Sequence, residues 1–194
     1  MTASRILAFA GSLRSASLNR KLLAVAVDGA RAAGAEVATI DLRDFPLPLY
    51  DGDLEAAEGL PAQVRSLKDL FKAHHGFLVA SPEYNSSITA VLKNTIDWVS
   101  RPDGPESGRV PYEGKVAGLF SASPGPYGAL RSLEVARSIL MTLGCLVVPQ
   151  RVALSRANQA FADDGTLKDP ELAGTVRGVA GEVVHVLSKL RGDR

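Results

Sequence analysis

A chain of 194 residues, 46% of them hydrophobic, is long enough for one large domain with a sizeable core, and no linker-like composition divides it. Its 22 Lys and Arg residues nearly balance its 21 Asp and Glu residues, so the charge gives no reason to expect a nucleic acid as partner. The single cysteine, Cys145, excludes an internal disulfide and a multi-cysteine metal site. Because no apolar run reaches the roughly 18 residues of a membrane span, we expect no membrane partner and a cytoplasmic location.

Short apolar runs alternate with segments of helical periodicity along the chain. The runs predict five strands, at residues 6–10, 36–41, 76–81, 115–121 and 145–149. The segments between and after them predict helices at 17–33, 61–73, 87–99, 127–143 and 170–190. Such alternation is typical of an α/β protein in which helices cover both faces of a parallel sheet.

The connections between these elements carry few signals of their own. We expect 42–59 and 101–113 to be loops and 151–169 to be an exposed tail of unassigned role. The acidic residues of the first loop are expected to face solvent: Asp51, Asp53, Glu55 and Glu58. His74 and His75 lie at a helix end, where cations meet the negative end of the dipole, and no metal site is predicted.

Hydroxyl and amide side chains follow the first predicted strand. The chain turns at Gly11 and continues through a polar segment with one cation, which contains Ser12, Arg14, Ser15, Ser17 and Asn19. A helix N-terminus has unpaired N–H groups and the positive end of the dipole, and an arginine adds a charge-assisted contact. This loop therefore predicts a site for a terminal phosphate, although it has neither a dinucleotide fingerprint nor a Walker sequence. The alternative is an ordinary turn with Ser17 or Asn19 as N-cap.

Polar loops also follow the third and fourth predicted strands. In the first of them Pro82 stiffens the chain, Tyr84 offers a flat ring and Asn85 offers hydrogen bonds to a ring system. The alternative is a turn capped by Asn85, Ser86 or Ser87, with Tyr84 exposed and Glu83 in solvent. In the second, glycines and prolines allow close approach of the main chain to a ligand, and Ser123 adds a hydroxyl.

The carboxyl ends of parallel strands meet at one sheet edge, and ligands bind there at the switch point of strand order. A phosphate site on one loop beside a ring frame on two others predicts a mononucleotide site. Flavin mononucleotide (FMN) suits it better than a nucleoside triphosphate, because no acidic residue is placed to hold magnesium.

Residues 11–19 (Gly-Ser-Leu-Arg-Ser-Ala-Ser-Leu-Asn) and 81–98 (beginning Ser-Pro-Glu-Tyr-Asn-Ser-Ser-Ile) resemble the NADPH-dependent FMN reductase family, which includes chromate, quinone and azo-dye reductases. Residues 41–51 and 123–128 also resemble it, so that the likeness covers about 5–150. The resemblance implies one flavodoxin-like domain over 1–194. In that fold a doubly wound five-stranded parallel sheet of order 2-1-3-4-5 forms the middle of three α/β/α layers.

The resemblance also assigns residues to the cofactor. It implies that the first loop holds the FMN phosphate, through Ser12, Arg14, Ser17, Leu18 and Asn19. It implies that the second frames the isoalloxazine, through Pro82, Glu83, Tyr84 and Asn85, and that Ser123 and Gly125 lie at the other edge of the flavin. Family members form homodimers or homotetramers with the flavin near a subunit interface.

We therefore expect an NAD(P)H-dependent oxidoreductase that contains FMN and transfers hydride in two half-reactions. Quinones, azo dyes, chromate or free flavin are the expected acceptors, and the donor is NADPH or NADH. No catalytic side chain is predicted, because the flavin carries the chemistry. Two alternatives remain: a flavodoxin-type electron carrier and a flavin-binding regulatory protein, neither with its own turnover. Flavodoxins are usually strongly acidic, unlike this chain.

Overall fold

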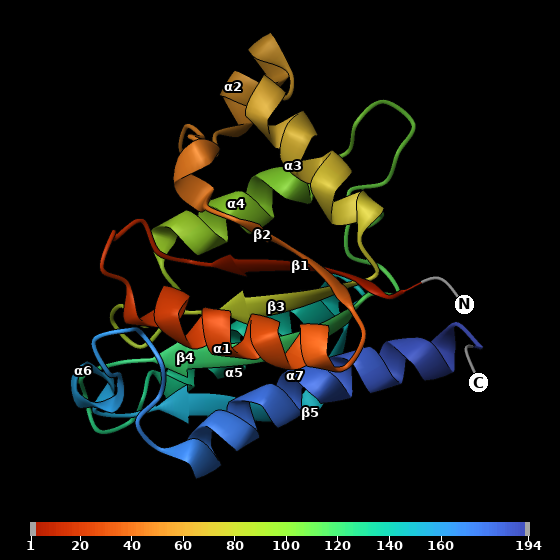
Figure 1. Cartoon of the computed structure of the whole chain (residues 1–194). Coiled ribbons are helices and arrows are strands. Elements are labelled where there is room, and N and C mark those ends of the chain that lie inside the picture. The colour runs from red at the N-terminus through yellow and green to blue at the C-terminus, as the bar shows by residue number, and fades with distance from the viewer. Residues whose placement is uncertain (1–2, 193–194) are drawn as a thin grey trace.

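Five parallel strands form the centre of the protein in the computed structural model, which describes residues 3–192 (Figure 1). The strands are β1 (Arg5–Ala10), β2 (Glu36–Ile40), β3 (Gly76–Ala80), β4 (Val116–Ala122) and β5 (Leu146–Leu154). The helices are α1 (Leu18–Ala32), α2 (Gly52–Glu58), α3 (Ala62–Ala73), α4 (Ala90–Val99), α5 (Leu130–Thr142), α6 (Ala157–Ala160) and α7 (Pro170–Leu190). The strand order β2-β1-β3-β4-β5 confirms the predicted doubly wound sheet.

Helices cover both faces of the sheet and make two cores. On one face, Ile6 and Ala8 of β1 pack in a cluster with α1 and α7; on the other, Leu7 and Phe9 pack in a cluster with α3, α4 and α5 (Figure 1). This alternation follows from the two-residue period of a strand. Helices α1 and α7 approach closely at Gly29, where a Cβ would lie 2.5 Å from the Cα of Arg177.

The predicted end of the fifth strand at residue 149 is wrong, and 151–169 is not an exposed tail. Strand β5 continues to Leu154, because Arg151–Leu154 pair with Leu119–Ala122 after a register shift. The shift places Val147 opposite Ala117 but Arg151 opposite Leu119, so β5 absorbs two extra residues. The polar residues at this irregularity hide the strand in the sequence. Beyond it lies α6, and Phe161 and Leu167 pair and pack into the core.

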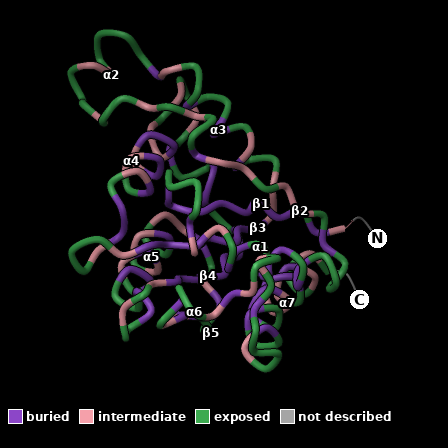
Figure 2. The backbone as a smooth tube through the Cα atoms, turned by 60° about the vertical axis from the view of Figure 1, so that its left-hand side comes forward, coloured by how far each residue is buried: buried purple, intermediate pink, exposed green. Residues whose placement is uncertain are grey.

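The segment 42–59 is also not a plain loop. It contains a 3-10 turn, Leu42–Asp44, and helix α2, which are capped by Asp41 and Asp51 respectively. No residue of α2 is buried, and Figure 2 shows this helix projecting from the rest of the backbone. Its acidic residues do not all face solvent freely, since Glu55 pairs with Arg101 at 2.9 Å and accepts a hydrogen bond from Tyr50.

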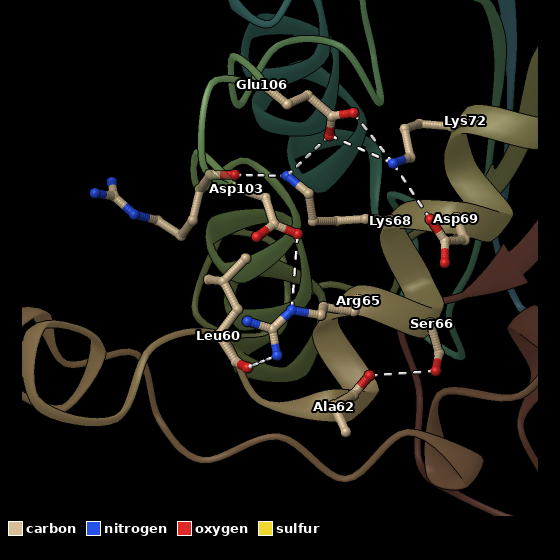
Figure 3. A network of polar contacts seen from close by, with 10 residues as sticks. Leu60, Ala62, Arg65, Ser66, Lys68, Asp69, Lys72, Asp103 and Glu106 are labelled. Carbon is tan, nitrogen blue, oxygen red and sulfur yellow. Dashed lines mark hydrogen bonds and ion pairs between the residues drawn. The ribbon is translucent and has the colours of Figure 1, made fainter.

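The loop after α4 is held against α3 by a buried lysine (Figure 3). Lys68 is 1% exposed, donates to the carbonyl of Arg101 at 2.6 Å and lies 3.6 Å from Glu106, which also pairs with Lys72. Burial lowers the pKa of Lys68, and the charge of Glu106 opposes that shift. A further ion pair, between Arg65 and Asp103, holds the same loop.

Two side chains with ionisable groups, Cys145 and His75, lie at least partly within the protein. Cys145 is a buried free thiol, and burial raises its pKa to about 12, as expected of a core side chain. His75 accepts a hydrogen bond at Nδ1 from the Arg5 main chain.

Within residues 3–192 no helix is long and apolar enough to cross a membrane, and no group of three or more His, Cys, Asp or Glu residues is placed to hold a metal.

Candidate cofactor site

The three polar loops meet at the carboxyl edge of the sheet and line one cavity, of about 90 Å³. We call it the cofactor cavity. Its lining consists of Ser12, Arg14, Ser17, Leu18, Asn19, Pro82, Glu83, Tyr84, Ala122, Ser123 and Pro124. Every predicted site residue is among them except Asn85 and Gly125. Sites that enclose a whole ligand usually exceed about 300 Å³, so this cavity has room for the phosphate end of a nucleotide, and a ring would extend over the surface beside it.

The first loop is held close to the start of α4. A Cβ at Gly11 would lie 2.8 Å from the Cβ of Leu92, so only glycine fits there. The Gly11 carbonyl accepts from the Thr89 hydroxyl at 2.7 Å, and its N–H donates to Ala80. Thr89 is also the N-cap of α4, which corrects the prediction that Asn85, Ser86 or Ser87 caps this helix.

The loop ends at the N-terminus of α1, where Ser17 is the N-cap and accepts from the N–H of Arg20. The main-chain N–H groups of Leu18 and Asn19 have no acceptor within residues 3–192. These free donors lie at the positive end of a helix dipole and beside the guanidinium-bearing Arg14. The arrangement suits an anion with several oxygen atoms, such as a phosphate.

Asn19 does more than line the cofactor cavity. Its side-chain amide donates to the carbonyl of Ala122 at 2.8 Å, and its side-chain oxygen accepts from the Ala122 N–H at 3.0 Å. The carboxamide thus pairs with the end of β4 as a neighbouring strand would. It ties the first loop to the third, and its polar atoms are already paired with protein.

The second loop contains a tight turn. Tyr84 and Ser87 exchange two main-chain hydrogen bonds, and the residues between them, Asn85 and Ser86, have φ angles of 51° and 65°. The left-handed conformation is one that asparagine tolerates better than most residues. Tyr84 is 55% exposed, and Asn85 lies in a separate groove beside α4.

Glu83 joins the second loop to α5, which the sequence did not indicate. Its carboxylate accepts from the main-chain N–H groups of Arg131 and Ser132 and from the Arg131 guanidinium, at 3.0 to 3.3 Å. A carboxylate at a helix N-terminus is stabilised by the free N–H groups and the dipole. Glu83 therefore braces the cavity wall rather than facing solvent.

The third loop depends on a glycine that the sequence did not single out. Gly128 has a φ of 59°, and a Cβ there would lie 2.5 Å from the main chain of Ala153. Gly125 has no such constraint, but its N–H donates to the Ser123 hydroxyl at 3.1 Å. Ser123 is also held by main-chain bonds to Leu154 and Ala157. The sequence did carry a signal for Gly128, since a glycine just before a helix often marks a left-handed turn.

A β1–α1 turn with free N–H donors, next to an exposed aromatic side chain at the switch point of the sheet, is the arrangement expected of a flavodoxin-like protein that binds a mononucleotide. The sequence profile of the NADPH-dependent FMN reductase family matches residues 4–159. The chain belongs to this family.

Curated relatives agree over nearly the full length. An NAD(P)H-dependent FMN reductase of Pseudomonas aeruginosa is 35% identical over 190 residues, which cover 97% of each chain. A probable NADPH:quinone oxidoreductase of Oryza sativa is also 35% identical, over 98% of this chain and 92% of the relative.

Solved structures show the same fold. The flavoenzyme NAD(P)H:(acceptor) oxidoreductase FerB from Paracoccus denitrificans superposes with a TM-score of 0.78 at 30% identity, covering 96% of this chain and 98% of its own. An archaeal flavodoxin superposes with a TM-score of 0.63 over 95% of this chain and 99% of its own. At 10% identity, that likeness shows the architecture alone.

Proposed function

We propose that residues 1–194 act as one FMN-dependent oxidoreductase that transfers two electrons from NADPH or NADH to quinones. In the overall reaction, NAD(P)H, a proton and a quinone give NAD(P)⁺ and a hydroquinone. The observation that carries the proposal is the meeting of three predicted loops around one cavity with free N–H donors. Relatives named as FMN and quinone reductases support it. Free flavin, azo dyes and chromate are further acceptors that the family suggests.

The residues of the cofactor cavity fit the phosphate of FMN. The N–H groups of Leu18 and Asn19, together with the hydroxyls of Ser12 and Ser17, offer hydrogen bonds to its oxygens. Among the described residues that line the cofactor cavity, Arg14 is the one cation, and it supplies charge. When bound, FMN supplies the two-electron chemistry through its ring.

The other two loops position the ring and leave one side open. Pro82 is buried and Tyr84 is exposed, so the second loop offers a rigid wall with an aromatic side chain at its rim. Of the titratable groups that line the cofactor cavity, Glu83 is engaged by α5, and Arg14 and Tyr84 reach water. Because this rim is open, solvent supplies the proton and two substrates can use the same face in turn.

We also propose that two copies associate through α4, as a homodimer or as part of a homotetramer. Two grooves flank this helix, of about 320 and 460 Å³, and their walls include exposed Leu13 and Tyr84. Light scattering gives the mass in solution. Val91→Glu, in the first groove, should lower that mass to the monomer, and an unchanged mass would place the interface elsewhere. The nicotinamide donor and the unpaired Cys145 support a cytoplasmic location.

Flavin titration and turnover test the proposal. FMN should bind and give visible absorbance, and the loaded protein should oxidise NADPH or NADH when quinone is present. Arg14→Ala should weaken FMN binding about tenfold or more, because a charge-assisted hydrogen bond contributes about 1.5–3 kcal/mol. Ser15→Ala, on the same loop but outside the cavity lining, is the matched control. Flavin binding without NAD(P)H oxidation would favour an electron carrier or regulatory protein, and absence of binding would overturn the assignment.

A further inference from the structure

A second and larger hollow lies beside the cofactor cavity, between α1 and β2. We call it the α1–β2 groove. It encloses about 420 Å³, which is in the usual range for a site that holds a small organic molecule. Its lining comprises Ala10, Ser12, Arg20, Leu23, Ala24, Val27, Asp28, Arg31, Thr39, Ile40, Asp41 and Asp44.

The α1–β2 groove has an apolar middle and charged ends. Leu23, Val27 and Ile40 provide aliphatic surface on which a flat ring can pack. Charges of both signs surround it: the lining includes Arg20, Arg31 and three carboxylates, and Arg43, next to the lining, pairs with Asp41 at 2.6 Å. A molecule with a flat ring and several hydroxyl groups, which both donate and accept hydrogen bonds, matches this lining.

Arg20 is held in a way that leaves hydrogen-bonding capacity unused. Its Nη2 pairs with Asp41 at 2.8 Å, but its Nη1 is buried and has no hydrogen-bond partner within residues 3–192. A buried unsatisfied polar group is rare in proteins and calls for an explanation such as an absent ligand. Arg20 lines the groove and about a third of its side chain is exposed, so a ligand in the groove that carries an acceptor is one such explanation.

Ser12 lines both the cofactor cavity and the α1–β2 groove, so the two sites are neighbours. A molecule that reaches the flavin with one end can therefore enter the groove with the other. We propose that the α1–β2 groove binds the adenosine half of the nicotinamide donor, with the adenine on the aliphatic surface and the ribose hydroxyls at Arg20 and Asp41. This inference rests on the proposed function, because it assigns a place to the donor of that reaction.

The charge of the groove also bears on the choice of donor. Arg20 and Arg43 both pair with Asp41, so among the remaining charges of the lining Arg31 is outnumbered by Asp28 and Asp44. A 2′-phosphate would add two negative charges beside these carboxylates, whereas a free 2′-hydroxyl adds none. The groove therefore favours the unphosphorylated ribose, and NADH should be used at least as efficiently as NADPH.

The test is to fill the α1–β2 groove without disturbing the core. Ala24 is exposed on α1 and lines the groove, so Ala24→Trp places an indole inside it. Ala32→Trp is the matched control, because Ala32 is exposed on the same helix but does not line the groove. Adenosine 5′-diphosphate, which has no nicotinamide, is the probe, and its binding to the FMN-loaded protein is measured by titration calorimetry.

We expect the parent and Ala32→Trp to bind adenosine 5′-diphosphate, and Ala24→Trp to bind it at least tenfold more weakly. The KM for NADH should rise by a similar factor in Ala24→Trp, while FMN affinity and the KM for quinone stay unchanged. Adenosine 2′,5′-diphosphate should bind the parent no more tightly than adenosine 5′-monophosphate, from which it differs only by the 2′-phosphate. Equal binding by Ala24→Trp and the parent, or no binding by the parent, would overturn this inference even where turnover supports the proposed function. Loss of turnover with every donor would overturn the proposed function, and the binding result would still decide whether adenosine occupies the groove.

Discussion

Removing the Asn19 side chain should weaken the whole molecule, because it joins two of the three loops of the cofactor cavity. Asn19→Ala deletes both hydrogen bonds to Ala122 and leaves a buried N–H and a buried carbonyl without partners. Leaving one such group unsatisfied costs about 1–3 kcal/mol, so the two together should cost about 2–6 kcal/mol of unfolding free energy. That is a large share of the roughly 5–15 kcal/mol by which domains are usually stable.

Urea unfolding of the flavin-free protein measures this loss. The only tryptophan, Trp98, is fully buried, so its fluorescence reports on unfolding. The midpoint should fall in Asn19→Ala, with an unchanged slope, because the surface exposed on unfolding is almost the same. FMN affinity should fall as well, since the N–H groups of the first turn of α1 would no longer be held in place.

Ser15→Ala is the control, because Ser15 is exposed on the same loop. It should change the unfolding free energy by no more than about 0.5 kcal/mol. A change equally small in Asn19→Ala would refute the reasoning, because it would mean that Ala122 finds other partners when the carboxamide is absent.

Three further predictions concern residues away from the cofactor cavity. Cys145 should not react with a thiol reagent at pH 8 in the folded protein but should react in urea, because burial raises its pKa to about 12; rapid labelling of the native chain would contradict this. Burial, with Arg191 and other cations nearby, lowers the pKa of His75, so the folded state favours the neutral ring. The stability that the neutral His75 contributes should be complete above about pH 6.5, the pKa of the unfolded chain, and should be lost as the pH falls below that value. The urea midpoint of His75→Gln should therefore decline less between pH 7 and pH 5 than that of the parent. Gly178→Ala in α7 should raise the unfolding free energy by about 0.5–1 kcal/mol, because a Cβ there meets nothing within 4 Å, whereas Gly29→Ala should lower it by about 1–3 kcal/mol through its clash with α7.

The sheet was accessible from the sequence because its strands are short apolar runs separated by helical periodicity. Strands such as β1 and β3 are buried on both faces, and such runs are visible without any long-range information. The second half of β5 was missed because it does not form such an apolar run. It contains Gln150 and Arg151, and pairs with β4 only after a register shift that no local pattern reveals.

The loops of the cofactor cavity were predicted by chemistry and by position. Hydroxyls, an arginine and a helix N-terminus at the end of a buried strand indicated an anion, and parallel strands bring their carboxyl ends together. The partners of individual side chains were not predictable. Glu83 binds the start of α5, 48 residues away, and Asn19 binds Ala122, 103 residues away. Such pairs exist only after the chain has folded.

The local sequence thus determined the α/β class and the three loops that form the cofactor cavity, and the family resemblance implied the strand order. Tertiary structure alone decided which polar groups remain free for a ligand and which are used to hold the loops. Hydrogen bonds between distant residues depend on the register of strands and the packing of helices, and neither is encoded within a short segment. For that reason the free N–H groups at α1, the brace at Glu83 and the α1–β2 groove became visible only in three dimensions.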